Sequence, residues 1–155
     1  MVDTELWSFA KKKPDEGRFA SREDFVRALD MHERARDFFL NVFPGLKVYM
    51  SVHQLAEIYH VLAFRGTRVS KAYAENVVRA ILEDERIVKV AVTLEHVVEA
   101  VRESVESNIH VWDYLCFIPV KDYIDTVFTC DRHFVTIGEK YDVKVVNPLG
   151  IWITL

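Results

Sequence analysis

The residues best suited to chemistry in this sequence are four acids that occupy comparable places in the predicted fold. Asp131 follows a β-branched and aromatic run from Ile124 to Thr129, where a buried strand is expected to end. Asp3 follows the first residues of the chain, Glu57 lies in a helix after a second strand, and Asp113 opens a late helix. Ligands of open α/β sheets bind beyond the carboxyl ends of the strands. The alternative for Asp131 is a helix N-cap, which Asp also favours.

The chemistry that four such acids perform together depends on a bound cation. Carboxylates that share a cleft repel one another and raise each other's pKa unless a cation lies among them. Oxygen ligands with few or no imidazoles favour hard ions such as Mg²⁺ or Mn²⁺. Such ions lower the pKa of a bound water, polarise a phosphate and neutralise charge on the leaving oxygen. The acids therefore predict a Mg²⁺ or Mn²⁺ site.

The composition fits one domain over residues 1–155, with half of the residues hydrophobic and 28% charged. The net charge of −4 argues against a broad basic face for duplex nucleic acid. It does not exclude a nuclease, because setting aside the four acids leaves 24 − 4 = 20 acids against 20 Lys and Arg. Small basic patches remain available around Lys11–Lys13 with Arg18 and Arg22, and around Arg65, Arg68 and Lys71.

Helical patterns alternate with short strands along the chain. Strands are expected over Leu46–Met50, Ile87–Val92, Ile124–Thr129 and Val143–Val146. Helices are expected from Ser21 to Pro44, from Ser51, from Ser70 to about Asp84, from Thr93 to Ser107, and over Ile109–Ile118. This alternation predicts a three-layer α/β/α fold with a mostly parallel central sheet.

Two of these helices have a predicted buried face. The helix after Ser51 should pack Leu55, Ile58, Tyr59 and Leu62 on the sheet, which leaves Glu57 on the opposite side. The helix after Thr93 should bury Val97, Ala100, Val101 and Val105.

The chain is expected to be a cytoplasmic protein with reduced cysteines. Its longest apolar run, Tyr114–Val120, is far too short to cross a bilayer, and its first residues do not have the pattern of a signal peptide. Cys116 and Cys130 lie in apolar runs without C-x-x-C spacing, so buried thiols are expected.

Several short segments, in this order and at this spacing, resemble the PIN domain. They are Val-Asp-Thr at residues 2–4, Ser-Val-His-Gln-Leu-Ala-Glu-Ile-Tyr at 51–59, Val-Trp-Asp-Tyr-Leu at 111–115, Thr-Cys-Asp-Arg-His-Phe at 129–134 and Val-Val-Asn-Pro at 145–148. The resemblance covers nearly the whole chain. By size, the most similar branch is the VapC-like toxin ribonucleases.

The resemblance implies a PIN-like fold, Mg²⁺ or Mn²⁺ as cofactor and hydrolysis of phosphodiester bonds in single-stranded RNA. Position by position, the acidic quartet of the family falls on Asp3, Glu57, Asp113 and Asp131, and its polar Ser/Thr falls on Thr129. Asp3 and Asp131 would be the central metal ligands. The other two acids would bind or orient the attacking water, and Thr129 would hold a carboxylate in place. A small antitoxin protein and a homodimer are further implications.

Two other interpretations stay open. His53, Glu57 and His60 share one helical face, and His110 and His133 lie near two of the acids, which would favour a zinc, iron or nickel protein. The other alternative is an interaction module without catalysis, which would require that the acids are scattered in the fold.

Overall fold

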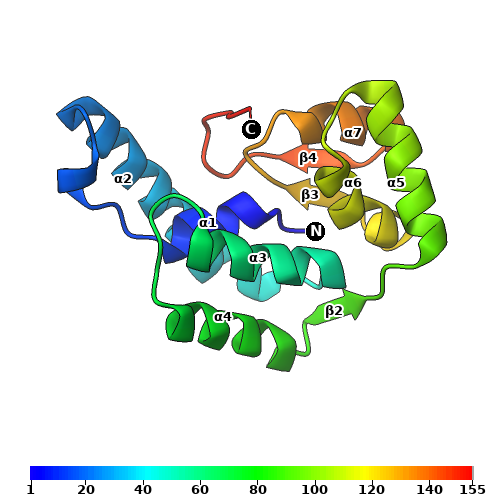
Figure 1. The fold of residues 1–155 in the computed structure, drawn as a ribbon, viewed down its shortest axis with the longest axis horizontal. Coiled ribbons are helices and arrows are strands. Elements are labelled where there is room, and N and C mark those ends of the chain that lie inside the picture. The colour runs from blue at the N-terminus through cyan, green and yellow to red at the C-terminus, as the bar shows by residue number, and fades with distance from the viewer. Residues whose placement is uncertain (155) are drawn as a thin grey trace.

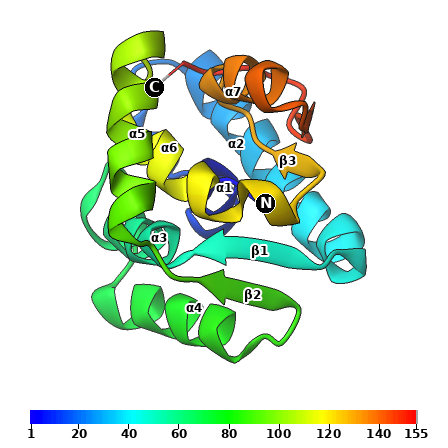
Figure 2. The same cartoon turned by 90° about the vertical axis from the view of Figure 1, so that its right-hand side faces the viewer.

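Two pairs of short parallel strands organise the fold in the computed structural model, which describes residues 1–154 (Figure 1). Strand β1 (Val48–Ser51) pairs with β2 (Ile87–Val90), and β3 (Thr126–Phe128) pairs with β4 (Lys144–Val146). Figure 2 shows β1 and β2 side by side above α4. The predicted α/β class is confirmed, with 63% helix. The strands form two-stranded sheets, so one continuous central sheet is not observed.

The N-terminal residues run beside β3. Val2 forms a parallel bridge with Phe128, whose amide donates a hydrogen bond to Met1 O (3.0 Å) and whose carbonyl accepts one from Asp3 N (2.9 Å). The side chain of Gln54 donates a further hydrogen bond to Val2 O at 2.7 Å. The first residues therefore form a single bridge to β3, and Asp3 follows it directly.

Serine and threonine caps begin four of the helices at the predicted places. In each case the backbone amide three residues after the cap residue donates a hydrogen bond to the cap hydroxyl. This bond satisfies one of the amides in the first turn that have no partner within the helix. These helices are α2 (Arg22–Asp37) after Ser21, α3 (Val52–Phe64) after Ser51, α4 (Lys71–Glu83) after Ser70, and α5 (Leu94–Ser107) after Thr93. Helix α2 continues into a π-helical turn (Phe38–Val42) and a 3₁₀ turn (Phe43–Gly45). The segment between α1 (Thr4–Lys11) and α2 contains one 3₁₀ turn (Glu16–Arg18).

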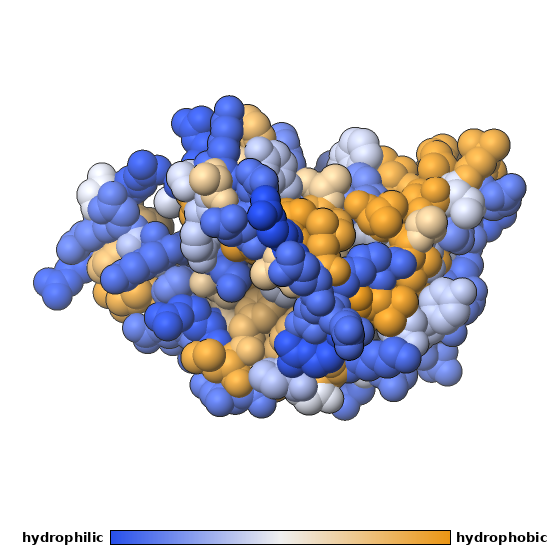
Figure 3. All heavy atoms as spheres, turned by 90° about the horizontal axis from the view of Figure 1, so that it is seen from below, coloured by the Kyte–Doolittle hydropathy of each residue, from blue (hydrophilic) through white to orange (hydrophobic). Residues whose placement is uncertain are grey.

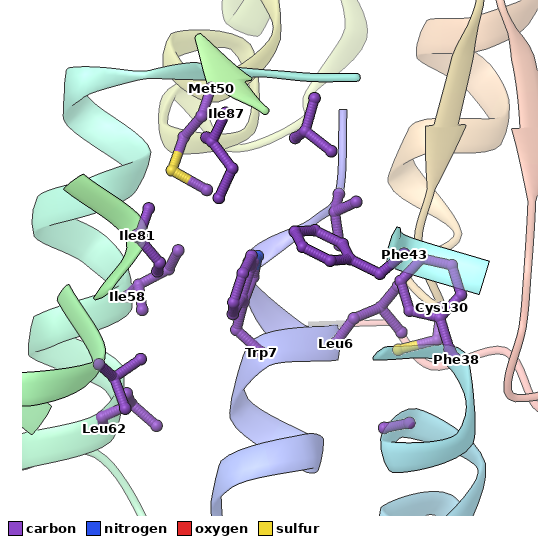
Figure 4. Close-up of a cluster of buried hydrophobic side chains, with 14 of the residues drawn as sticks. Leu6, Trp7, Phe38, Phe43, Met50, Ile58, Leu62, Ile81, Ile87 and Cys130 are labelled. Atoms are coloured by element: carbon purple, nitrogen blue, oxygen red, sulfur yellow. The ribbon is translucent and has the colours of Figure 1, made fainter. Parts of the chain in front are cut away.

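The larger core joins α1 to the β1–β2 pair and to α2, α3 and α4 (Figure 4). Trp7 packs against the rings of Phe39 and Phe43. Ile58 and Leu62 of α3 are fully buried, as predicted for that helix. A second core lies between α6 (Val111–Phe117), β3 and α7 (His133–Tyr141). The thiols of Cys116 and Cys130 are unbridged and buried, which confirms their predicted state.

Helix α7 is absent from the helices expected from the sequence, where a helix after Asp131 was implied only by the N-cap alternative for that residue. Its backbone approaches β4 closely, because a Cβ atom placed on Gly138 would lie 2.4 Å from Val145 Cγ2 and 2.7 Å from Val143 O. Val143 N also donates to Gly138 O at 2.9 Å. Helix α6 ends as predicted before Pro119, which lies in a 3₁₀ segment (Ile118–Tyr123).

The predicted orientation of α5 is wrong. Ala100 is buried, but Val97, Val101 and Val105 are exposed, Val105 to 80%. The helix instead turns its polar side inward, because Glu103 pairs with Lys140 and Glu99 pairs with Lys121. Seen from below, hydrophobic residues gather on the right of the molecule, where Figure 1 places α5 (Figure 3). Among residues 1–154, no helix is long and apolar enough to cross a membrane.

We predict that Gly138→Ala destabilises the protein by about 1–3 kcal/mol, because the new methyl group must displace backbone at Val143. This cost should outweigh the roughly 1 kcal/mol that Ala gains over Gly within a helix. Gly45→Ala is the matched control, since nothing lies within 4 Å of its added Cβ atom. Urea unfolding of the three proteins measures the effect, and an unchanged midpoint for Gly138→Ala would refute the close approach.

Candidate active site

The four predicted acids come together in one pocket of about 250 Å³. Asp3 precedes α1, Glu57 lies in α3, Asp113 lies in the first turn of α6, and Asp131 lies after β3. We call this the acidic pocket; its lining is completed by Thr4, Glu5, Arg65, His110, Trp112 and Cys116. Segments separated by more than a hundred residues therefore place their carboxyl groups around one space.

Thr129 joins the two buried acids of the pocket. Its hydroxyl donates a hydrogen bond to Asp3 Oδ2 at 2.6 Å and accepts one from Asp131 N at 2.9 Å. Asp3, Thr129 and Asp131 are all buried. The contact therefore fixes the carboxylate of Asp3 relative to the backbone that carries Asp131.

Two residues that were not predicted to belong to the site contact Glu57. Thr4 Oγ1 donates a hydrogen bond to Glu57 Oε2 at 2.5 Å, and Cys116 Sγ lies 3.4 Å from the same oxygen. The position of each in the sequence, close to one of the predicted acids, could have indicated this role. Thr4 directly follows Asp3, and Cys116 lies three residues after Asp113, on the same side of α6.

His133 completes a compact group of possible metal ligands. One ligand atom from each of Asp113, Asp131 and His133 lies within 4.8 Å of the others. His133 Nδ1 is 3.1 Å from Asp113 Oδ2 and 3.6 Å from Asp131 Oδ2. The sequence analysis considered this histidine only within the rival interpretation, whereas Asp3 and Glu57 lie outside the group.

Asp131 also supports the start of α7. Its Oδ1 accepts a hydrogen bond from His133 N at 3.0 Å, while its Oδ2 faces the His133 ring. The N-cap of α7 is Arg132, so Asp131 is not the cap residue that the alternative expected, although its side chain accepts this one amide and lies in the acidic pocket.

The helical histidine site of the rival interpretation does not form among residues 1–154. His53 stacks on Trp112, with ring centroids 5.2 Å apart, and His60 stacks on Phe64 at 5.7 Å. Neither belongs to the group of close ligand atoms. His110 lies nearer, with its ring 6.0 Å from the ring of His133.

Burial and mutual repulsion raise the pKa values of several acids in the pocket. Burial raises the pKa of Asp3 well above its ordinary value, although the Thr129 hydroxyl opposes the shift. Burial and then the charge of Asp131 raise the pKa of Asp113 to about 6, against the effect of His133. Burial also raises the pKa of Glu5, in spite of the Arg65 guanidinium 3.4 Å away. The pocket therefore favours the entry of a proton or a cation.

The donor set fits a divalent cation. Two carboxylates and one imidazole nitrogen are ligands that Mn²⁺ accepts, and the other carboxylates of the pocket supply the oxygen-rich surroundings of Mg²⁺ and Mn²⁺ sites. Imidazole also suits zinc and iron, so the donor set alone does not choose the metal. In comparisons with known proteins, neither a family model nor a curated protein matches this chain.

We predict that Asp113→Asn raises the melting temperature of the metal-free protein near pH 7.5 and leaves it almost unchanged near pH 4. A folded-state pKa of about 6 against the ordinary 3.8 means that the ionised carboxyl destabilises the fold increasingly between these values and fully above them. Removing this charge should stabilise the fold by up to about 2–3 kcal/mol.

Thermal melts in EDTA at both pH values test the prediction. Asp122→Asn is the control, because Asp122 is an exposed acid outside the pocket. Saturating Mn²⁺ should cancel the advantage, since a metal bound only to the folded state stabilises the wild type more. A variant that melts well below wild type in EDTA would identify Asp113 as a structural acid.

Proposed function

We propose that this chain is a metal-dependent endoribonuclease that hydrolyses phosphodiester bonds of single-stranded RNA. The observation that carries the proposal is the acidic pocket, in which the four expected acids lie with a group of close ligand atoms from Asp113, Asp131 and His133. The alternative of an interaction module without catalysis required that the acids be scattered in the fold. Their presence in one pocket argues against that alternative.

The residues have different parts in the proposed reaction. Asp113, Asp131 and His133 would hold Mg²⁺ or Mn²⁺, because their ligand atoms are close enough to share one ion. When bound, the ion activates a water molecule and neutralises charge on the phosphate. Glu57 Oε2 is engaged by Thr4 and Cys116, and Oε1, which has no partner among residues 1–154, would accept a proton from that water. Thr129 positions Asp3 beside the backbone of Asp131.

The proposal includes a three-layer, PIN-like arrangement. The parallel pairing in both sheets and the bridge from Val2 to β3 support it. The hydrogen bond from Gln54, in the helix after β1, to Val2 O links the N-terminal residues to the other strand pair. A function as the toxin of a toxin–antitoxin pair, with a small antitoxin protein, rests on the sequence resemblance alone.

We predict that RNA cleavage requires Mg²⁺ or Mn²⁺ and that Asp131→Asn cleaves at least about a hundredfold more slowly, because the ion loses a ligand. Asp3→Asn should lose a similar factor. Asp15→Asn, at an exposed position in the loop after α1, should keep the wild-type rate. Cleavage of a labelled single-stranded RNA is measured with each metal and in EDTA. Full activity of the wild type in EDTA, or of both pocket variants with metal, would refute the proposal.

Metal titration separates the proposal from the helical histidine interpretation. Calorimetry with Mn²⁺ should give heat in the double variant His53→Ala/His60→Ala and none in Asp131→Asn. The reverse result would place the metal on α3. Binding of Zn²⁺ or Fe²⁺ without any RNA cleavage would favour a transition-metal protein.

We further propose that the chain forms a homodimer through α5. Its exposed Leu94, Val98, Val101 and Val105 follow the four- and three-residue spacing of a helix-pairing seam. The same row of apolar side chains on a second copy of the chain can pack against it across a two-fold axis, so a homodimer would bury these residues. The neighbouring Glu95, Arg102 and Glu106 supply charges of both signs beside the seam.

We predict that wild type sediments with about twice the mass of one chain and that Val101→Glu sediments as a monomer, because a buried unpaired carboxylate opposes association. Val26→Glu, which adds the same charge at an exposed valine of α2, is the matched control and should remain dimeric. A monomeric wild type, or a dimer that survives Val101→Glu, would contradict this interface.

A further inference from the structure

A solvent-exposed tryptophan stands directly beside the acidic pocket. Trp112 precedes Asp113 in the first turn of α6 and is 54% exposed. The imidazole of His53 lies almost parallel to its indole, with an interplanar angle of 9°. We call this pair the aromatic shelf. Packing against His53 restricts the indole, so a ligand that stacks on it pays little further conformational entropy.

The shelf borders a second pocket of about 510 Å³ that also contains His60. This second pocket and the acidic pocket share Glu57, Arg65 and Trp112, so they form one continuous cleft. The shared tryptophan lies between the carboxylates at one end and an apolar and aromatic surface at the other.

Arg65 brings positive charge to the second pocket. It follows the last turn of α3 and lines both pockets, and Lys12 Nζ donates a hydrogen bond to Arg65 O at 2.9 Å. Arg68 and Lys71 follow it in the sequence as exposed residues. A phosphate group is expected at Arg65, whose guanidinium lies 3.4 Å from Glu5 Oε1 and is half-exposed.

His53 lines the second pocket together with Trp112. Its Nε2 is buried and has no hydrogen-bond partner within residues 1–154, so the stacked rings offer a ligand a flat surface and not this nitrogen.

We propose that the aromatic shelf binds one unstacked nucleobase of single-stranded RNA next to the scissile phosphate. The proposal rests on the proposed ribonuclease function and names how that site selects its substrate. Every base has a π-face, so a tryptophan surface accepts any of them, and single strands can expose bases that a duplex keeps stacked. Trp112 is a positioning residue, because it would hold the base while the acids act on the neighbouring phosphate.

Binding of a short single-stranded oligoadenylate in EDTA tests the shelf without cleavage. Fluorescence anisotropy should show that Trp112→Ala weakens binding about tenfold or more, whereas Trp112→Phe keeps most of the affinity. Tyr123→Ala is the matched control, because Tyr123 is also exposed and also stacks on another ring, that of Tyr49, but lies outside the cleft.

Abasic substitution separates stacking from a structural effect. Removing the base at one position of the strand should weaken binding to wild type by a similar factor and should hardly affect the already weak binding to Trp112→Ala. Equal affinity of wild type and Trp112→Ala for the intact strand would overturn the proposal, as would equal losses from the abasic position in both proteins.

These experiments also test the base-binding proposal separately from the proposed ribonuclease function. If Trp112→Ala cleaves RNA with unchanged KM and kcat, the proposed base binding by the aromatic shelf is refuted and the proposed ribonuclease function is kept. Base-dependent binding without cleavage in Mg²⁺ or Mn²⁺ would support the shelf and refute the nuclease. The absence of any binding by wild type would overturn the shelf.

Discussion

The pairing of residues 1–3 with β3 is the contact on which the acidic pocket depends. Three backbone hydrogen bonds join Met1 and Asp3 to β3, across almost the whole length of the chain. They bring Asp3 within reach of the Thr129 hydroxyl and so close to Asp131. Because the contact is so distant in sequence, its closure costs more chain entropy than a local contact does. The pocket is therefore a product of the completed fold.

The same closure brings together charges that repel one another. Burial raises the pKa values of Asp3, Glu5 and Asp113, and this rise is opposed by the Thr129 hydroxyl at Asp3 and by the His133 imidazole at Asp113. Arg65 is a full positive charge at the pocket, but it is half-exposed and already faces Glu5. Clustered buried acids lower the stability of the folded chain, and a bound cation would raise it by neutralising their charge. Functional sites commonly reduce stability in this way.

Local sequence signals predicted where several helices start. The features that were predicted wrongly or not at all depend on contacts between residues far apart in the sequence. The cap residues Ser51, Ser70 and Thr93 predicted their helices because a cap acts within one turn. Helix α7 was missed because it is short and because Asp131, the cap that the sequence offered as an alternative, is not its N-cap, which is Arg132. The valines of α5 predicted the wrong face, since only the folded structure reveals that Lys121 and Lys140 attract its glutamates inward. The acids of the pocket were predicted from their positions after strands, whereas His133 required knowledge of how α7 begins.

The inward polar face of α5 links the proposed dimer seam to the cleft. Ser104 donates a hydrogen bond to Ile109 O, and Tyr114 of α6 donates one to Ser107. Asn108 joins the two helices in a left-handed conformation (φ 58°), so the connection is short and sharply turned. Helix α6 carries both Trp112 and Asp113 in its first turn. A second copy that covers the valines of α5 would therefore pack on the helix that leads directly into α6, which carries Trp112 of the aromatic shelf and the proposed metal ligand Asp113.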